Sequence, residues 1–209
     1  MAARDHAFFL RTATGLARLG VTPNVISVIG MGLGVAGGVA LAATAADLAE
    51  ANRRLLFLLA AVLIPLRGVC NILDGVVAVN CAKLSPTGVL FNEVPDRISD
   101  AAMLIGAGYA FGGNPTLGLL AAGLAIFVAY LRSAIKTAGA PQDFCGPMAK
   151  PMRIGLMTTA CVCAAVAPGL TEQAMVVVLL TICVGCVLTA IRRLHRAATR
   201  LNGSVSNER

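Results

Sequence analysis

The chain has 209 residues, a net charge of +7 at pH 7, and an apolar fraction of 57% against 13% charged residues. Its mean hydropathy of +0.81 exceeds what a soluble domain of this length needs, since about half apolar is already typical. The composition therefore predicts a single integral membrane domain over residues 1–209 and argues against a soluble domain that binds nucleic acid.

Residues 1–20 are predicted to form an amphipathic helix on the membrane surface. Arg4, Arg11 and Arg18 recur every seven residues, so they share one helix face, whereas the phenylalanines and leucines point in other directions. The segment lacks the long apolar core of a signal peptide. It suits a helix that lies on an anionic membrane before the first span.

Six apolar stretches follow, each near the roughly 20 residues that a bilayer core requires. They cover residues 23–46, 55–79, 88–111, 116–137, 152–169 and 173–191. Residues 192–209 are predicted to be a basic cytoplasmic tail. The predicted fold class is therefore an all-α integral membrane protein with six transmembrane helices, preceded by an interfacial helix.

The basic residues divide unequally between the two sides of these spans. With the N-terminus inside, thirteen lie on the inner side and only Arg53 and Arg54 on the outer side. The inner residues are Arg4, Arg11, Arg18, Lys83, Arg132, Lys136, Lys150, Arg153, Arg192, Arg193, Arg196, Arg200 and Arg209. Because cytoplasmic segments carry the Lys/Arg excess, we expect a multi-pass protein of the cell membrane with both termini in the cytoplasm.

A stripe of small residues marks the first span. Gly30, Gly34 and Gly38 recur at a spacing of four, which places them on one helix face. Glycine stripes let a neighbouring helix approach closely, and we therefore interpret this stripe as a packing surface. The seven cysteines are likewise interpreted as small apolar or loop side chains, with no disulfide or metal role.

Acidic residues gather between residues 71 and 100. Four of the ten carboxylates lie there, namely Asp74, Glu93, Asp96 and Asp100. Asn71 shares a helix face with Asp74 in the second span, and Asn92 lies one turn before Asp96 in the third. A short link makes these spans antiparallel neighbours, so their polar faces are expected to meet near the inner surface.

Charges inside a membrane are costly and need compensation. Three interpretations fit the acidic cluster. The first is a divalent-cation site that binds substrate phosphates, since Mg²⁺ prefers oxygen ligands. The second is a structural ion-pair network with Arg67 and Arg97, and the third is an ion pathway.

The motif Asp74-Gly75-x2-Ala78, followed by Gly88 and Asp96, resembles the signature of the CDP-alcohol phosphatidyltransferase family, D-x2-D-G-x2-A-R-x8-G-x3-D-x3-D. The resemblance implies six spans and transfer of a phosphatidyl group from a CDP-lipid, in the first instance CDP-diacylglycerol, to an alcohol, with release of CMP. It also implies Mg²⁺ or Mn²⁺, Asp96 as the catalytic base, and a homodimer. The residues implied for nucleotide binding are Asp74, Gly75, Ala78 and Gly88.

The chain departs from that signature at three positions. Asparagine replaces the first and third aspartates at positions 71 and 92, and Val79 replaces the arginine. The chain thus resembles a branch of the family with asparagine at both positions. The implied metal-binding set is Asn71, Asp74, Asn92 and Asp96, with Glu93 and Asp100 as compensating acids. A catalytically inactive relative that binds lipid or nucleotide is the alternative.

Three basic residues are candidates for binding a phosphate on the acceptor alcohol. Arg132 ends the fourth span, and Lys150 and Arg153 lie three residues apart at the start of the fifth. Charged hydrogen-bond donors of this kind bind phosphates strongly. Glycerol 3-phosphate and an inositol phosphate are examples of such an acceptor. The same residues also fit the cytoplasmic charge excess without any ligand.

Overall fold

The structure, a computed structural model, describes residues 7–80, 87–141 and 145–207, and these residues form helices and connecting links without strands. The helices are α1 (Ala7–Arg18), α2 (Pro23–Ala43), α3 (Glu50–Asn80), α4 (Gly88–Gly108), α5 (Pro115–Thr137), α6 (Lys150–Val166) and α7 (Thr171–Asn207). A short 3₁₀ turn, η1 (Pro168–Leu170), separates α6 from α7. The all-helical prediction is confirmed for the described residues.

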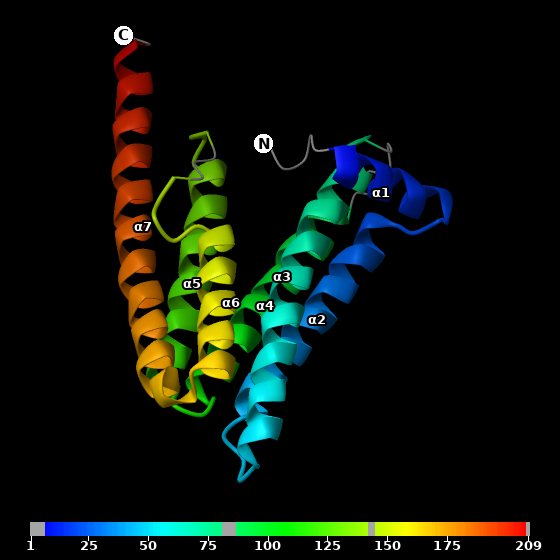
Figure 1. The fold of residues 1–209 in the computed structure, drawn as a ribbon. Helices are drawn as coiled ribbons and strands as arrows, with labels where there is room; N and C mark the ends of the chain where they lie inside the picture. The colour runs from blue at the N-terminus through cyan, green and yellow to red at the C-terminus, as the bar shows by residue number, and fades with distance from the viewer. Residues whose placement is uncertain (1–6, 81–86, 142–144, 208–209) are drawn as a thin grey trace.

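The long helices form two neighbouring groups whose directions differ, so that the groups diverge toward the end of the molecule where α1 lies (Figure 1). In the first group, α2 packs against both α3 and α4, while α1 lies across the end of α3. In the second, α5 packs against α7 and α6 also packs against α7. Two contacts join the groups, one between α3 and α6 and the other between α4 and α5. The chain termini lie at the same end of the molecule (Figure 1).

Two of the long helices begin at residues that favour helix starts. The Thr22 side chain accepts a hydrogen bond from the Val25 amide of α2, and Asn114 accepts one from the Leu117 amide of α5 at 3.0 Å. In each helix a proline follows the capping residue, where its fixed backbone and missing N–H are tolerated. These local signals place the helix starts close to the predicted positions.

Within the part of the chain that the structure describes, four helical segments are long and apolar enough to cross a membrane, namely Pro23–Ala43, Glu50–Asn80, Pro115–Thr137 and Pro168–Asn202. Helix α4 carries four charged residues within 21 positions, and α6 has only 17 residues. The four apolar segments are those of a multi-pass membrane protein. The number of six spans and the cytoplasmic orientation stay predictions.

The predicted boundaries differ from the observed helices by a few residues at most ends. Helix α2 ends at Ala43 rather than at residue 46, and α6 covers Lys150–Val166 rather than residues 152–169. Helix α3 begins at Glu50 rather than at residue 55, and α4 ends at Gly108 rather than at residue 111. Helix α7 continues to Asn207 through most of the predicted tail 192–209. Arginine, alanine and leucine dominate that segment and are good helix formers, so the helix continues beyond the apolar stretch.

Helix α2 lies very close to its neighbours along the glycine stripe. A Cβ atom added to Gly34 would lie 2.5 Å from the Ser99 Cβ of α4, and one added to Gly38 would overlap the Ala102 carbonyl oxygen. On Gly30, it would meet the Cys70 Cβ of α3 at 2.9 Å. The predicted packing role is therefore confirmed, because the glycine stripe lets α2 pack closely against both α3 and α4.

Helix α1 buries one face against the end of α3 that lies near the chain termini. Ala13 is buried in a cluster with Leu73, Val76 and Val77. Arg11 and Arg18 are exposed, whereas Arg4 lies outside the described residues. The amphipathic helix is thus present from residue 7 to residue 18, and its location on a membrane surface stays a prediction.

Candidate functional site

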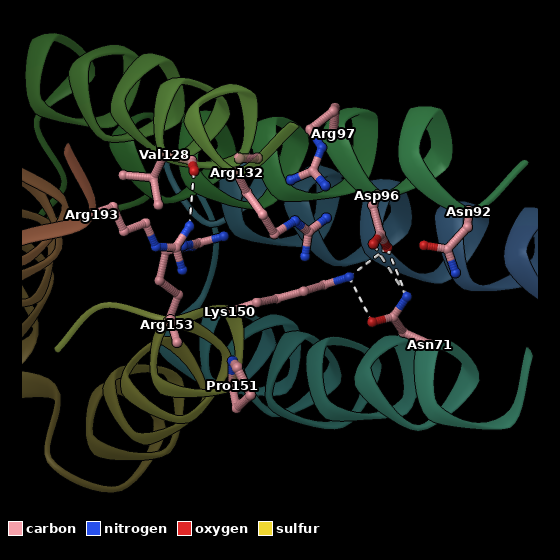
Figure 2. A pocket seen from close by; sticks show the side chains of 12 residues that line it. Asn71, Asn92, Asp96, Arg97, Val128, Arg132, Lys150, Pro151, Arg153 and Arg193 are labelled. Carbon is pink, nitrogen blue, oxygen red and sulfur yellow. Dashed lines mark hydrogen bonds and ion pairs between the residues drawn. The ribbon is translucent and has the colours of Figure 1, made fainter. Parts of the chain in front are cut away.

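A cavity of about 430 Å³ opens where the two groups of helices meet (Figure 2). Five helices supply its wall: α3, α4, α5, α6 and α7. The lining residues are Asn71, Asn92, Asp96, Arg97, Val128, Ala129, Arg132, Ala149, Lys150, Pro151, Arg153 and Arg193. The cavity therefore brings together members of the predicted metal-binding set and all three predicted phosphate-binding residues.

Asp96 is the acid among these lining residues, and it contacts side chains of α3 and α6 (Figure 2). Its Oδ1 lies 2.5 Å from Lys150 Nζ and 3.2 Å from Arg67 Nη2. Asn71 Nδ2 donates to both carboxylate oxygens, at 3.1 and 3.2 Å. The polar faces of α3 and α4 therefore meet, as the sequence predicted, and a lysine from α6 joins them.

Lys150 connects the two signature segments. In addition to its contact with Asp96, its Nζ donates to Asn71 Oδ1 at 2.8 Å. The residue precedes the predicted span 152–169. Burial lowers the pKa of its ammonium group to about 8, and the nearby Arg67 acts in the same direction, while Asp96 and Asp100 act against them. The ammonium group thus remains mostly charged at pH 7.

Asp74 has a different environment, being only 2% exposed. Its Oδ2 accepts a hydrogen bond from Ser27 Oγ of α2 at 2.6 Å, whereas its Oδ1 has no hydrogen-bond partner among the described residues. A cavity of about 10 Å³, lined in part by Asp74, Asn71, Asp96 and Arg67, lies beside it. That volume is close to the space that one water molecule or one small ion occupies.

A buried ion-pair network lies next to this cavity. Arg67 Nη2 is 2.7 Å from Asp100 Oδ1, and Arg153 Nη2 is 2.8 Å from Asp100 Oδ2. Arg67 also donates from Nε to Ser99 Oγ at 2.9 Å, and Arg153 from Nη1 to the Met148 carbonyl at 2.9 Å. The network joins α3, α4 and α6, as the structural ion-pair interpretation expected for Arg67.

Glu93 makes its contacts with two arginines that line the larger cavity. It pairs with Arg97 at 2.5 Å and with Arg132 of α5. Glu93 and Asp100 were both predicted to compensate for the asparagines in metal binding. The structure gives their carboxylates arginine partners instead, so this role stays a prediction.

The other residues implied for nucleotide binding lie outside the wall of the larger cavity. Gly75 and Ala78 are half-buried on α3, and Gly88 is the first residue of α4. Val79, where the family signature has arginine, is 65% exposed. The nucleotide-binding role of the first three residues stays a prediction.

Two residues that complete the site carry no functional signal in the sequence. Arg193 of α7 is 5% exposed and donates to the Val128 carbonyl at 2.9 Å and to the Cys145 carbonyl at 3.1 Å. It was counted only as cytoplasmic charge, because its sequence position gives no indication that α7 packs against α5. Ser27 carries no charge and lies among apolar residues, so nothing in the sequence indicated its bond to Asp74.

The oxygen donors near Asp74 fit one divalent cation. Among the described residues no group of three His, Cys, Asp or Glu side chains gathers in a metal-binding arrangement. Asp74 and Asp96 nevertheless line the same small cavity together with the Asn71 amide, and Asp74 Oδ1 is a buried acceptor without a donor. Carboxylate and amide oxygens are suitable ligands for Mg²⁺ or Mn²⁺.

No protein-family model matches this sequence, and comparison with curated proteins also finds no match. Solved structures do match. Phosphatidylinositol phosphate synthase of Mycobacterium tuberculosis, solved in complex with manganese and citrate, is 22% identical, with a TM-score of 0.72 over 91% of this chain and 89% of that chain. The same enzyme solved with CDP-DAG bound is 21% identical, with a TM-score of 0.72 over 92% of this chain and 94% of that chain. The resemblance noted in the signature motif is thus confirmed in three dimensions, and the chain has the fold of a CDP-alcohol phosphatidyltransferase.

Proposed function

We propose that this chain is a CDP-alcohol phosphatidyltransferase, which transfers a phosphatidyl group from CDP-diacylglycerol to the hydroxyl of a phosphorylated alcohol and releases CMP. One observation carries the proposal. The cavity of about 430 Å³ joins the Asn71, Asn92 and Asp96 wall to a group of cations from α5, α6 and α7. The similar enzymes solved with manganese and with CDP-DAG support both the metal and the lipid substrate.

The reacting end of the site is assigned to the two signature segments. Asp74 and Asp96, with the amides of Asn71 and Asn92, would hold a divalent ion, which would neutralise charge on the pyrophosphate. Asp96 accepts the proton of the attacking hydroxyl as the new O–P bond forms and the bond to CMP breaks. For that step Asp96 exchanges one of its present donors for the hydroxyl.

The cationic end of the cavity is assigned to the acceptor phosphate. Arg132, Lys150, Arg153 and Arg193 all line it (Figure 2). Two of the three N–H donors of Lys150 bind Asp96 and Asn71, so the third is available for a phosphate oxygen. The phosphate of a phosphorylated acceptor would add charged hydrogen bonds to those that these four side chains already make, which favours such an acceptor over a neutral alcohol. The proposed orientation has this end of the molecule, with both termini, in the cytoplasm, and the assembly is a homodimer by family resemblance.

CMP release tests the activity directly. Purified protein with CDP-diacylglycerol and Mg²⁺ is offered glycerol 3-phosphate, an inositol phosphate, glycerol or inositol, and the lipid products are identified by mass spectrometry. Asp96→Asn should lower turnover by at least about 100-fold, as expected for loss of a general base. Asp47→Asn, in the exposed link between α2 and α3, is the matched control and should leave turnover unchanged. Absence of CMP with every acceptor contradicts the proposal.

The second candidate is a relative that binds lipid or nucleotide without turnover. It is favoured by the contacts of Asp96 Oδ1 with Lys150, Arg67 and Asn71, since one of these donors must leave before a substrate hydroxyl can bind that oxygen. Nucleotide binding measured by calorimetry separates the two candidates. Binding of CDP-diacylglycerol without CMP release with any acceptor supports the inactive relative.

A further inference from the structure

The position of Lys150 carries an inference about how many metal ions the site takes. Its ammonium nitrogen lies 2.5 Å from Asp96 Oδ1 and 2.8 Å from Asn71 Oδ1. Both oxygens come from residues of the predicted metal-binding set, one on α4 and one on α3. A side-chain cation thus joins the two helices through oxygens that a metal ion would otherwise share (Figure 2).

The carboxylates around the small cavity are already matched by side-chain cations. Asp74, Asp96 and Asp100 lie beside Arg67, Lys150 and Arg153, and all of these except the half-buried Asp96 and Lys150 are fully buried. Arg97, Arg132 and Arg193 add further positive charge to the larger cavity, and Glu93 pairs with the first two. Each divalent ion added to this group brings two uncompensated positive charges, and mutual repulsion in a buried environment is expensive. The site is therefore less able to hold two divalent ions than a set of four aspartates.

We propose that the Lys150 ammonium group replaces one divalent cation, so that the site binds a single Mg²⁺ or Mn²⁺ beside Asp74. Asparagine at position 71 is consistent with this replacement. The neutral Asn71 amide and the Asp96 carboxylate together carry one negative charge, which a single ammonium group compensates. This inference rests on the proposed function for the identity of the ion, but it concerns the number of ions rather than the reaction.

The position left for one ion is defined by Asp74. Its Oδ1 is the buried carboxylate oxygen without a hydrogen-bond partner among the described residues, and the adjacent cavity of about 10 Å³ has room for one small ion. Asp96 and Asn71 line the same cavity. Lys150 does not line it, so its ammonium group and the ion can be present together.

Mn²⁺ binding to the purified protein in detergent tests the inference without any turnover. Electron paramagnetic resonance of free Mn²⁺ and calorimetry give the number of ions per chain and their affinity. We expect one Mn²⁺ in the wild type. Lys150→Met removes the charge at similar length and should either admit a second ion or tighten binding by about 10–100-fold. Adding Asn71→Asp to that variant should strengthen the second site further.

Lys136→Met is the matched control, because this lysine is exposed at the end of α5, and it should leave one ion with unchanged affinity. Two ions in the wild type overturn the inference whether or not the Lys150 variant folds. It is also overturned if the wild type binds none, or if folded Lys150→Met binds Mn²⁺ as the wild type does. One bound ion without CMP release would defeat the proposed function alone, whereas CMP release with two bound ions would defeat this inference alone.

Discussion

Asp100 should contribute more to stability than any exposed acid of this chain. Its two oxygens bind Arg67 at 2.7 Å and Arg153 at 2.8 Å, and it is 2% exposed. Removing one partner of a buried ion pair typically costs about 3–5 kcal/mol. Arg67 keeps Asp96 and Ser99 Oγ as partners, and Arg153 keeps the Met148 carbonyl, so we expect Asp100→Ala to cost about 3 kcal/mol, the lower end of that range.

Thermal unfolding of the purified protein in detergent measures this cost. For a chain of this length about 1 kcal/mol corresponds to a shift of roughly 2–4 °C, so the midpoint should fall by roughly 6–12 °C. Glu50→Ala is the control, since Glu50 and Arg54 form an exposed pair worth at most about 1 kcal/mol. An Asp100→Ala shift no larger than the control would refute the reasoning. Weaker Mn²⁺ binding at unchanged stability would instead support the compensating role predicted from the sequence.

Two further outcomes are expected. Arg132→Ala should raise the KM for a phosphorylated acceptor by about tenfold or more, the loss of one charged hydrogen bond, and leave the KM for CDP-diacylglycerol unchanged. Lys136→Ala, one turn further along α5, is its control, and equal damage to both KM values would show that Arg132 serves only in structure or topology. Gly38→Ala should destabilise the protein by about 1–3 kcal/mol, because the added methyl overlaps the backbone of α4. Gly32→Ala meets nothing within 4 Å and should be neutral or slightly stabilising; similar melting temperatures for the two variants would contradict the packing argument.

The sequence predicted the helices well, because each carries a strong local signal. Thr22-Pro23 and Asn114-Pro115 mark two starts, and apolar stretches of about the right length follow them. The ends were predicted less accurately. Helix α7 continues from its apolar part into its basic part without a break. Hydropathy marks where a membrane span ends, whereas the end of the helix depends on the helix propensity of the residues that follow.

The sequence indicated most of the residues that line the site, including the basic residues Arg132, Lys150 and Arg153, but not which side chains contact one another across distant segments. The spacing of Asn71, Asn92 and Asp96 placed them on facing helix surfaces, and the structure brings all three to one cavity. Partners from distant segments could not be assigned. Lys150 is 79 positions from Asn71, and a charge pattern gives the side of the membrane on which a lysine lies but not the side chain it contacts.

The pairing of Arg67 with acids of the next helix bears on how the protein enters the membrane. An arginine near the middle of α3 and the acids of α4 each oppose insertion of a lone helix into lipid. Paired, these charges compensate one another within the protein. Helix α4, although predicted as a span from the sequence, carries four charged residues and is less apolar than the four segments that are apolar enough to cross a membrane. The two helices should therefore leave the translocation machinery as a hairpin, with α3 retained beside the channel until α4 has been synthesised.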